Sequence, residues 1–85
     1  MWVKVVREGH PATQFKMYQL IDISQGGISF KSHAALEFKR GDLLFILEVE
    51  DKVLEDTIRA KVVYVQYLDD FGVDFKIGIE FTEKI

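Results

Sequence analysis

The sequence contains no cysteine, a single proline and no long hydrophobic run. Without cysteine, the chain cannot form disulfides, thiolate metal sites or thiol nucleophiles. Its longest apolar stretch, residues 43–47, is far shorter than the roughly 20 residues that a membrane-spanning helix needs. No charged segment followed by an apolar one opens the chain, so nothing indicates export. We therefore expect a cytoplasmic protein that does not insert into a membrane.

Positive charge and histidine are also scarce. Eleven basic residues stand against fourteen acidic ones, and the formal net charge of −3 argues against DNA or RNA as a partner. His10 and His33 are not at metal-ligand spacing, so each is expected in an exposed loop and no metal or other cofactor is expected. Ser24 and Ser29 have no histidine nearby in the sequence, and no acid–base set stands out. We do not expect an enzyme.

The composition that remains is that of one small globular domain. The 85 residues are 48% hydrophobic and 13% aromatic, which excludes a disordered chain. A chain of this length buries only about 60% of its unfolded surface, which is enough for one core and too little for two. Residues 1–85 are therefore predicted to form a single domain, either complete or cut from a longer chain.

Apolar residues recur with period two, which predicts strands. The clearest alternation predicts that Val73, Phe75, Ile77, Ile79 and Phe81 face the core. The nearly continuous apolar residues of 43–49 predict a strand buried on both sides. A sheet this small must protect its edges, and closure does so. We predict an all-β fold, a six-stranded antiparallel β-barrel with at most one short helical turn, at 33–38. The predicted strands are 2–7, 13–23, 28–31, 43–49, 57–67 and 73–81, with a polar hairpin tip at 50–52.

The most informative segment is D-I-S-Q-G-G at residues 22–27, between two predicted strands. At a strand end Asp22 and Ser24 point the same way and offer a charged acceptor beside a hydroxyl. The two glycines can take positive φ and let the backbone approach a flat ligand. Such a carboxylate suits the N–H donors on the edge of a guanine. The same residues also suit a tight turn in which Asp and Ser bond their own backbone, and both interpretations stand.

Around this segment the chain resembles a PilZ domain. The signature of that family is Asp or Asn, any residue, Ser, two further residues and Gly. Asp22, Ser24 and Gly27 fill its three defined positions. The resemblance covers about residues 2–82. Further family features follow in order, namely an apolar strand at 28–30, Gly41 before a long strand pair, and a closing G-x-x-F at Gly78 and Phe81.

The resemblance implies a six-stranded barrel that binds the bacterial second messenger cyclic di-GMP. In the family the Asp and Ser contact guanine, and the last Gly lets the loop pass close to the base. Those roles fall here on Asp22, Ser24 and Gly27. Ligand binding typically changes how the domain sits against a partner protein or an attached domain. The resemblance therefore implies a receiver with an unidentified partner or fused domain, and with motility, adhesion or exopolysaccharide production as the output.

The chain departs from the family in its arginines. PilZ domains grip the phosphates with two arginines four apart, usually just ahead of the first strand. Here Met1 and Trp2 already stand at that strand, and Arg7 is followed four places later by Pro11. Losing two charge-assisted contacts would weaken binding by orders of magnitude. Either the pair lies upstream in a longer chain, or the domain binds the messenger weakly or not at all. Arg7, and after it Arg40, are the candidate phosphate ligands in the sequence.

The missing pair leaves a second hypothesis open. A divergent PilZ-like module could bind a protein and no nucleotide, with exposed aromatic residues as its contact surface. Trp2, Tyr18 and Tyr67 are candidates because each can flank the core instead of filling it. Ordinary packing within the barrel is the other interpretation of these three side chains.

Overall fold

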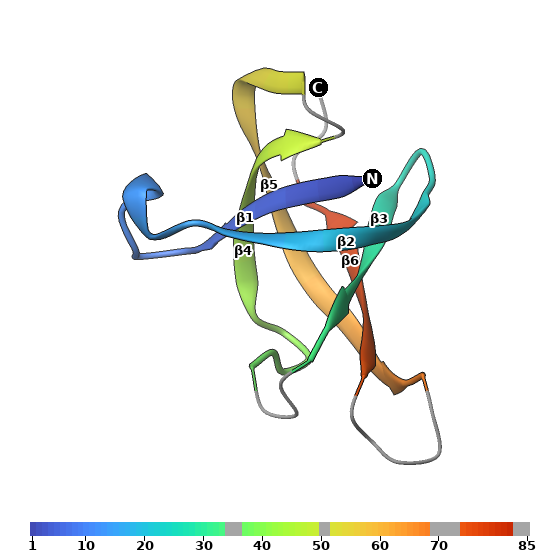
Figure 1. Cartoon of the computed structure of the whole chain (residues 1–85). Coiled ribbons are helices and arrows are strands. Elements are labelled where there is room, and N and C mark those ends of the chain that lie inside the picture. Colours follow the sequence, from blue (N-terminus) through green and yellow to red (C-terminus); the bar gives the residue numbers. More distant parts are fainter. Residues whose placement is uncertain (34–36, 50–51, 69–73, 83–85) are drawn as a thin grey trace.

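The chain closes into a small barrel of six antiparallel strands (Figure 1). The computed structural model describes residues 1–33, 37–49, 52–68 and 74–82, with the backbone alone for 52–56. The strands are joined in the order β1-β2-β3-β6-β5-β4, and β4 returns to β1 to close the sheet. This confirms the predicted fold class. The elements are β1 (Trp2–Arg7), η1 (Ala12–Gln14), β2 (Lys16–Ile23), β3 (Gly27–Ser32), β4 (Leu43–Val49), β5 (Lys52–Tyr67) and β6 (Phe75–Phe81).

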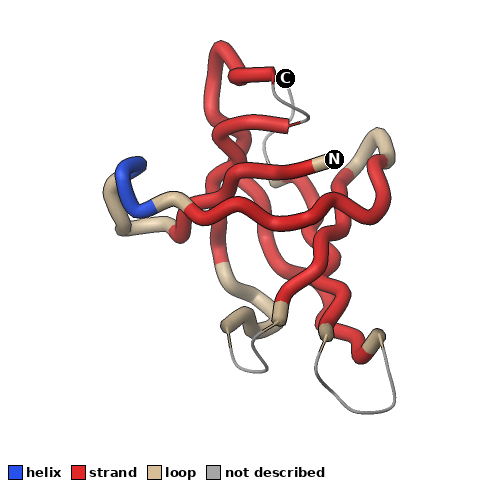
Figure 2. Tube along the Cα trace, viewed as in Figure 1, coloured by secondary structure: helices blue, strands red, loops and turns tan. Residues whose placement is uncertain are grey.

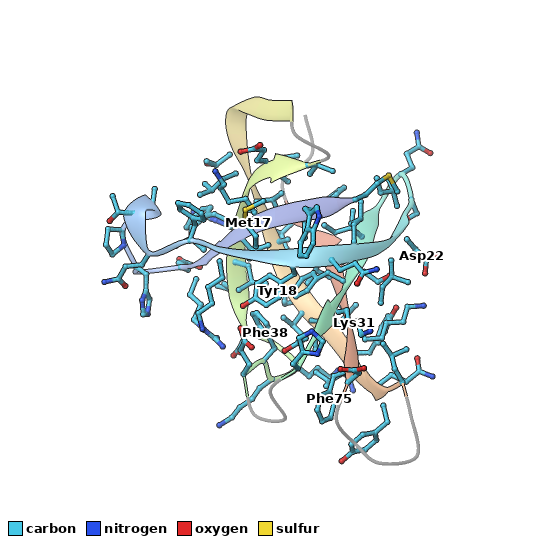
Figure 3. The ribbon with its side chains drawn as sticks, in the orientation of Figure 1. Met17, Tyr18, Asp22, Lys31, Phe38 and Phe75 are labelled. Atoms are coloured by element: carbon cyan, nitrogen blue, oxygen red, sulfur yellow. The ribbon has the colours of Figure 1, made fainter. Side chains whose placement is uncertain are left out.

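Alternate side chains of each strand fill the interior. Phe75, Ile77 and Ile79 are buried as the alternation of β6 predicts, whereas Phe81 is only partly buried. Phe30 of β3 is fully buried and meets the rings of Tyr18 and Phe38, with ring centroids 4.7 and 5.3 Å away. These aromatic contacts lie under β2, as Figure 3 shows for Tyr18 and Phe38. Among the residues that the structure describes, the other buried hydrophobic side chains are Val3, Val5, Val6, Leu20, Ile28, Phe38, Leu44, Ile46, Ala60 and Val62.

Several predicted boundaries differ from the observed ones. The one helical turn among the described residues is η1, where a strand from residue 13 was expected (Figure 2). Pro11 fixes φ at −67° and its carbonyl accepts from Gln14 N at 2.9 Å, which closes a turn before β2. β5 also begins at Lys52 instead of residue 57. Of the turn expected at 33–38, residues 34–36 lie outside the described part, as do residues 50, 51 and 73 of other predicted elements.

The prediction that β4 is buried on both sides is wrong. Leu44 and Ile46 are fully buried, but Leu43 is 39% exposed and Phe45 is only partly covered. β4 lies between β1 and β5 in a single closed sheet layer. Its outer face therefore meets solvent, and the apolar run reflects β-propensity as well as burial.

Four of the strand pairings contain a register shift, and the β-bulges in β2 and β5 each re-aim a side chain. In β2 the register shifts between Leu20 and Asp22, and in β5 it shifts between Val62 and Tyr64. Leu20 and Val62 face the core, so strict alternation would place Asp22 and Tyr64 there too. Each bulge adds one residue and re-aims the next side chain outward. Asp22 and Tyr64 consequently both lie on the outer surface.

Candidate functional site

The predicted D-x-S-x-x-G segment forms the turn between β2 and β3 and borders an open depression of about 360 Å³. Asp22 lies at the periphery of the barrel, close to this turn (Figure 3). Asp22, Ser24 and Gly27 all line the depression, so the structure brings these three predicted site residues together. Its other lining residues are Gly26, Ile28, Ser29, Val63, Tyr64, Gly78, Ile79 and Glu80.

Ser24 closes the turn through its own main chain. Its backbone N–H donates to the Gly27 carbonyl at 2.9 Å and its hydroxyl donates to the same oxygen at 3.1 Å. The Gly26 carbonyl accepts from Phe81 N at 2.8 Å, which ties the turn to β6. Ser24 thus follows the tight-turn interpretation, although its hydroxyl oxygen keeps the capacity to accept a hydrogen bond.

Gly27 is required by space and not by backbone conformation. Gly26 and Gly27 do not use the positive φ that glycine permits, because the described glycines with positive φ are Gly9 and Gly41. A Cβ added at Gly27 would overlap the carbonyl oxygen of Ile79 on β6, whereas one at Gly26 would meet open space. The missing side chain of Gly27 therefore lets β3 and β6 approach each other beneath the depression.

Asp22 bonds other side chains and not its own backbone. Its Oδ2 accepts from the Ser29 hydroxyl at 3.2 Å and lies 3.0 Å from Lys76 Nζ. Within the described part of the chain, Oδ1 has no hydrogen-bond partner, and the side chain is 65% exposed. The hydrogen bond from Lys76, and its charge, hold the pKa of Asp22 below the ordinary value. Asp22 is therefore ionised at neutral pH and presents acceptor oxygens only.

The depression also contains residues that sequence reasoning did not assign to it. Asp22 pairs with Ser29, Ser29 with Gly78, and Gly78 with Tyr64, which makes one outward row across β2, β3, β6 and β5. Lys76 joins this row through Asp22, and the Tyr64 hydroxyl helps to raise the Lys76 pKa after the larger effect of Asp22. No local sequence signal identifies Tyr64 or Lys76, because their approach to Asp22 depends on the strand order β2-β3-β6-β5.

Arg7 and Arg40 are not part of this row. Pairing of Val3 with Tyr18 and of Val5 with Lys16 places the end of β1 at the start of β2, roughly 25 Å along the strands from Asp22. There Arg7 pairs with Asp42 at 3.1 Å and lies over the Phe38 ring. Arg40 is exposed in the turn before β4. Neither arginine lines the depression.

The other singled-out side chains lie elsewhere. His10 and His33 are exposed; their Nδ1 atoms bond Gln14 and Asp74 respectively. Among described residues no group of three or more His, Cys, Asp or Glu could hold a metal, and no described helix is both long and apolar enough to cross a membrane. Trp2 and Tyr67 are 51% and 68% exposed, whereas Tyr18 is partly buried against the core.

Comparisons with known proteins agree with this architecture. The family model described as PilZ domain matches residues 3–85, nearly the whole chain. No curated protein matches significantly, and no solved structure does either. The match spans the six strands and the D-x-S-x-x-G turn alike. The chain belongs to the PilZ family, a family of cyclic di-GMP receptors.

Proposed function

We propose that this domain binds cyclic di-GMP in the depression beside the β2–β3 turn and passes the messenger level to a partner protein or an attached domain. The observation that carries the proposal is the state of Asp22. It is ionised and exposed, and it lines an open depression of about 360 Å³ together with Ser24 and Gly27. A carboxylate accepts both N–H groups on the edge of a guanine, which an adenine does not offer in that arrangement. Motility, adhesion or exopolysaccharide control is the proposed output.

The phosphates of the ligand need cations, and the described residues supply lysines near the depression. Lys76 Nζ stands at Asp22, and Lys31 is its cross-strand partner on β3. Lys31 pairs with Asp74 at 3.4 Å, so both lysines already have acidic partners. A guanine that takes the Asp22 carboxylate would free Lys76 for a phosphate. We expect weaker binding than two arginines would give, because a lysine lacks the bidentate fork of a guanidinium.

The test is a calorimetric titration of cyclic di-GMP against the wild type and Asp22→Ala. We expect Asp22→Ala to weaken binding by about tenfold or more, because it removes the acceptor for the guanine edge. Glu48→Ala is the control: it also removes one carboxylate paired with a lysine, although a less exposed one, on β4 and outside the depression. Equal affinities of wild type and Asp22→Ala would show that the proposed site is wrong.

The alternative function is a protein-interaction module that does not bind the nucleotide. The observation that favours it is the position of Arg7, which is held by Asp42 far from the depression. Trp2 and Tyr67, both more than half exposed, would then belong to the contact surface. A folded wild-type protein that shows no heat of binding with millimolar cyclic di-GMP would favour this alternative over the receptor.

A further inference from the structure

The two β-bulges aim Asp22 and Tyr64 at the same patch of surface from opposite sides. The bulge in β2 turns Asp22 outward, and the bulge in β5 does the same for Tyr64. Both then stand on the outward row that crosses β3 and β6 at Ser29 and Gly78. Bulges are enriched next to sites where a side chain must be re-aimed. Four strand pairings contain a register shift, and the two in β2 and β5 are those that bring Asp22 and Tyr64 to this depression.

Gly78 gives the Tyr64 ring a place to lie. A Cβ added at Gly78 would overlap Cε2, Cζ and Cδ2 of Tyr64, so the ring covers the backbone of Gly78. Glycine inside a strand weakens the strand unless another group approaches closely. Here the group is an aromatic ring that remains 38% exposed and lines the depression. The ring therefore rests on the sheet with part of its surface open to solvent.

Asp22 and Tyr64 border the same depression, and Lys76 stands beside both. Measured along the curved sheet, three strand spacings, about 14 Å, separate the Cα atoms of Asp22 and Tyr64, and the straight-line distance is shorter. On the outer surface, the Asp22 side chain extends toward β3 and accepts from the Ser29 hydroxyl, and the Tyr64 ring extends over Gly78 of β6. Lys76 links the two groups: its Nζ lies 3.0 Å from the Asp22 carboxylate, and, after the larger effect of Asp22, a hydrogen bond with the Tyr64 hydroxyl helps to raise its pKa. A planar base stacked on the exposed part of the ring would lie in the depression that Asp22 also lines, and its edge would replace Lys76 at the carboxylate.

We propose that Tyr64 is a purine-binding residue whose ring, seated on Gly78, stacks against the base that Asp22 recognises by its edge. This proposal rests on the proposed function, and it adds a residue that lies outside the D-x-S-x-x-G segment. Stacking does not discriminate among bases, because every base has a π face. Tyr64 would therefore supply affinity, while Asp22 would supply preference for guanine.

The test compares Tyr64→Phe, Tyr64→Leu and wild type in titrations with cyclic di-GMP followed by nuclear magnetic resonance. Tyr64→Phe keeps the ring and should bind within about twofold of wild type, whereas Tyr64→Leu should bind about tenfold more weakly, the usual order for loss of a base stack. The guanine H8 signal should shift upfield in wild type and Tyr64→Phe and lose that shift in Tyr64→Leu. The matched control is Tyr67→Leu, which removes an exposed tyrosine of the same strand outside the depression.

The outcomes distinguish the stacking role of Tyr64 from the proposed receptor function on which it rests. If wild type binds and Tyr64→Leu binds equally well with the same H8 shift, the stacking role is wrong and the receptor function stands. If Asp22→Ala binds as well as wild type, or wild type does not bind at all, the proposed function fails and the stacking role fails with it. If Tyr64→Leu loses affinity while its urea midpoint and the Tyr67→Leu affinity stay unchanged, the stacking role is supported.

Discussion

Two carboxylates of this barrel have the same kinds of partners and opposite surroundings. Asp22 accepts from the Ser29 hydroxyl and pairs with Lys76, while Glu37 accepts from the hydroxyls of Tyr18 and Ser32. Lys16 stands 3.7 Å from Glu37, so each acid also has a lysine. The Asp22 side chain is 65% exposed, however, and that of Glu37 only 15%.

The difference in exposure means that the Asp22 carboxylate can still bind a ligand, whereas the Glu37 carboxylate cannot. Glu37 lies where Tyr18 and Phe38 cover the barrel interior, and both of its oxygens are engaged by hydroxyls. Asp22 engages only Oδ2 with its described partners and lies away from that cluster (Figure 3). A ligand could replace the exposed bond of Lys76 to Asp22 at little cost, since exposed ion pairs contribute little to stability. Hydrogen bonding alone therefore does not show that a carboxylate serves only the fold. Its exposure decides whether it can also bind a ligand.

The largest expected effect comes from the backbone beneath Asp22. Gly27→Ala places a methyl group on the Ile79 carbonyl and must push β3 from β6, so it should lower the free energy of unfolding by about 3 kcal/mol. Gly26→Ala is the control, because its Cβ meets nothing within 4 Å and its φ is not positive. Urea denaturation of both variants measures the difference. Equal urea midpoints would mean that the two strands can separate locally without cost.

The next effect tests the comparison of the two acids directly. Glu37→Ala removes the acceptor of the half-buried Tyr18 hydroxyl and should cost about 2 kcal/mol of folding free energy. Asp22→Ala should leave the urea midpoint close to that of wild type, because its side chain is mostly in water. The affinities for cyclic di-GMP should behave oppositely, with Asp22→Ala weakened and Glu37→Ala unchanged while folded. A destabilised Asp22→Ala would break the distinction between an open acid and a structural one.

The sequence was sufficient for the fold because the fold depends on alternation and turn residues. The spacing of Phe75, Ile77 and Ile79 identifies the core face of β6, and it does so without knowledge of any partner strand. The bounds of β4 also follow from the sequence, although its outer face is not buried. The start of β2 does not follow from the sequence. Strand propensity favours a strand from residue 13, but Pro11 is followed there by the short turn η1.

The site follows from the sequence only in part. The D-x-S-x-x-G spacing identifies one side of the depression, and the structure brings Asp22, Ser24 and Gly27 together there. Tyr64 and Lys76 come from strands β5 and β6, and their approach depends on the order β2-β3-β6-β5 and on two bulges. No local pattern encodes the pairing of strands distant in the chain. The same argument explains Arg7, whose distance from Asp22 is set by the antiparallel register of β1 and β2.

The smallest expected effect is on the pH dependence of stability, and it tests Tyr18, the buried partner of Glu37. Burial, followed by the hydrogen bond with Glu37 and its negative charge, raises the pKa of Tyr18 above the ordinary 10.0. The folded chain then keeps the proton where the unfolded chain loses it, so this contribution is complete below pH 10 and declines as the pH rises further. Tyr18→Phe should be less stable at pH 7 by about 1 kcal/mol and should lose less stability between pH 9 and about 11 than wild type. Parallel slopes for wild type and Tyr18→Phe would mean that burial and Glu37 together do not keep Tyr18 protonated in the folded chain.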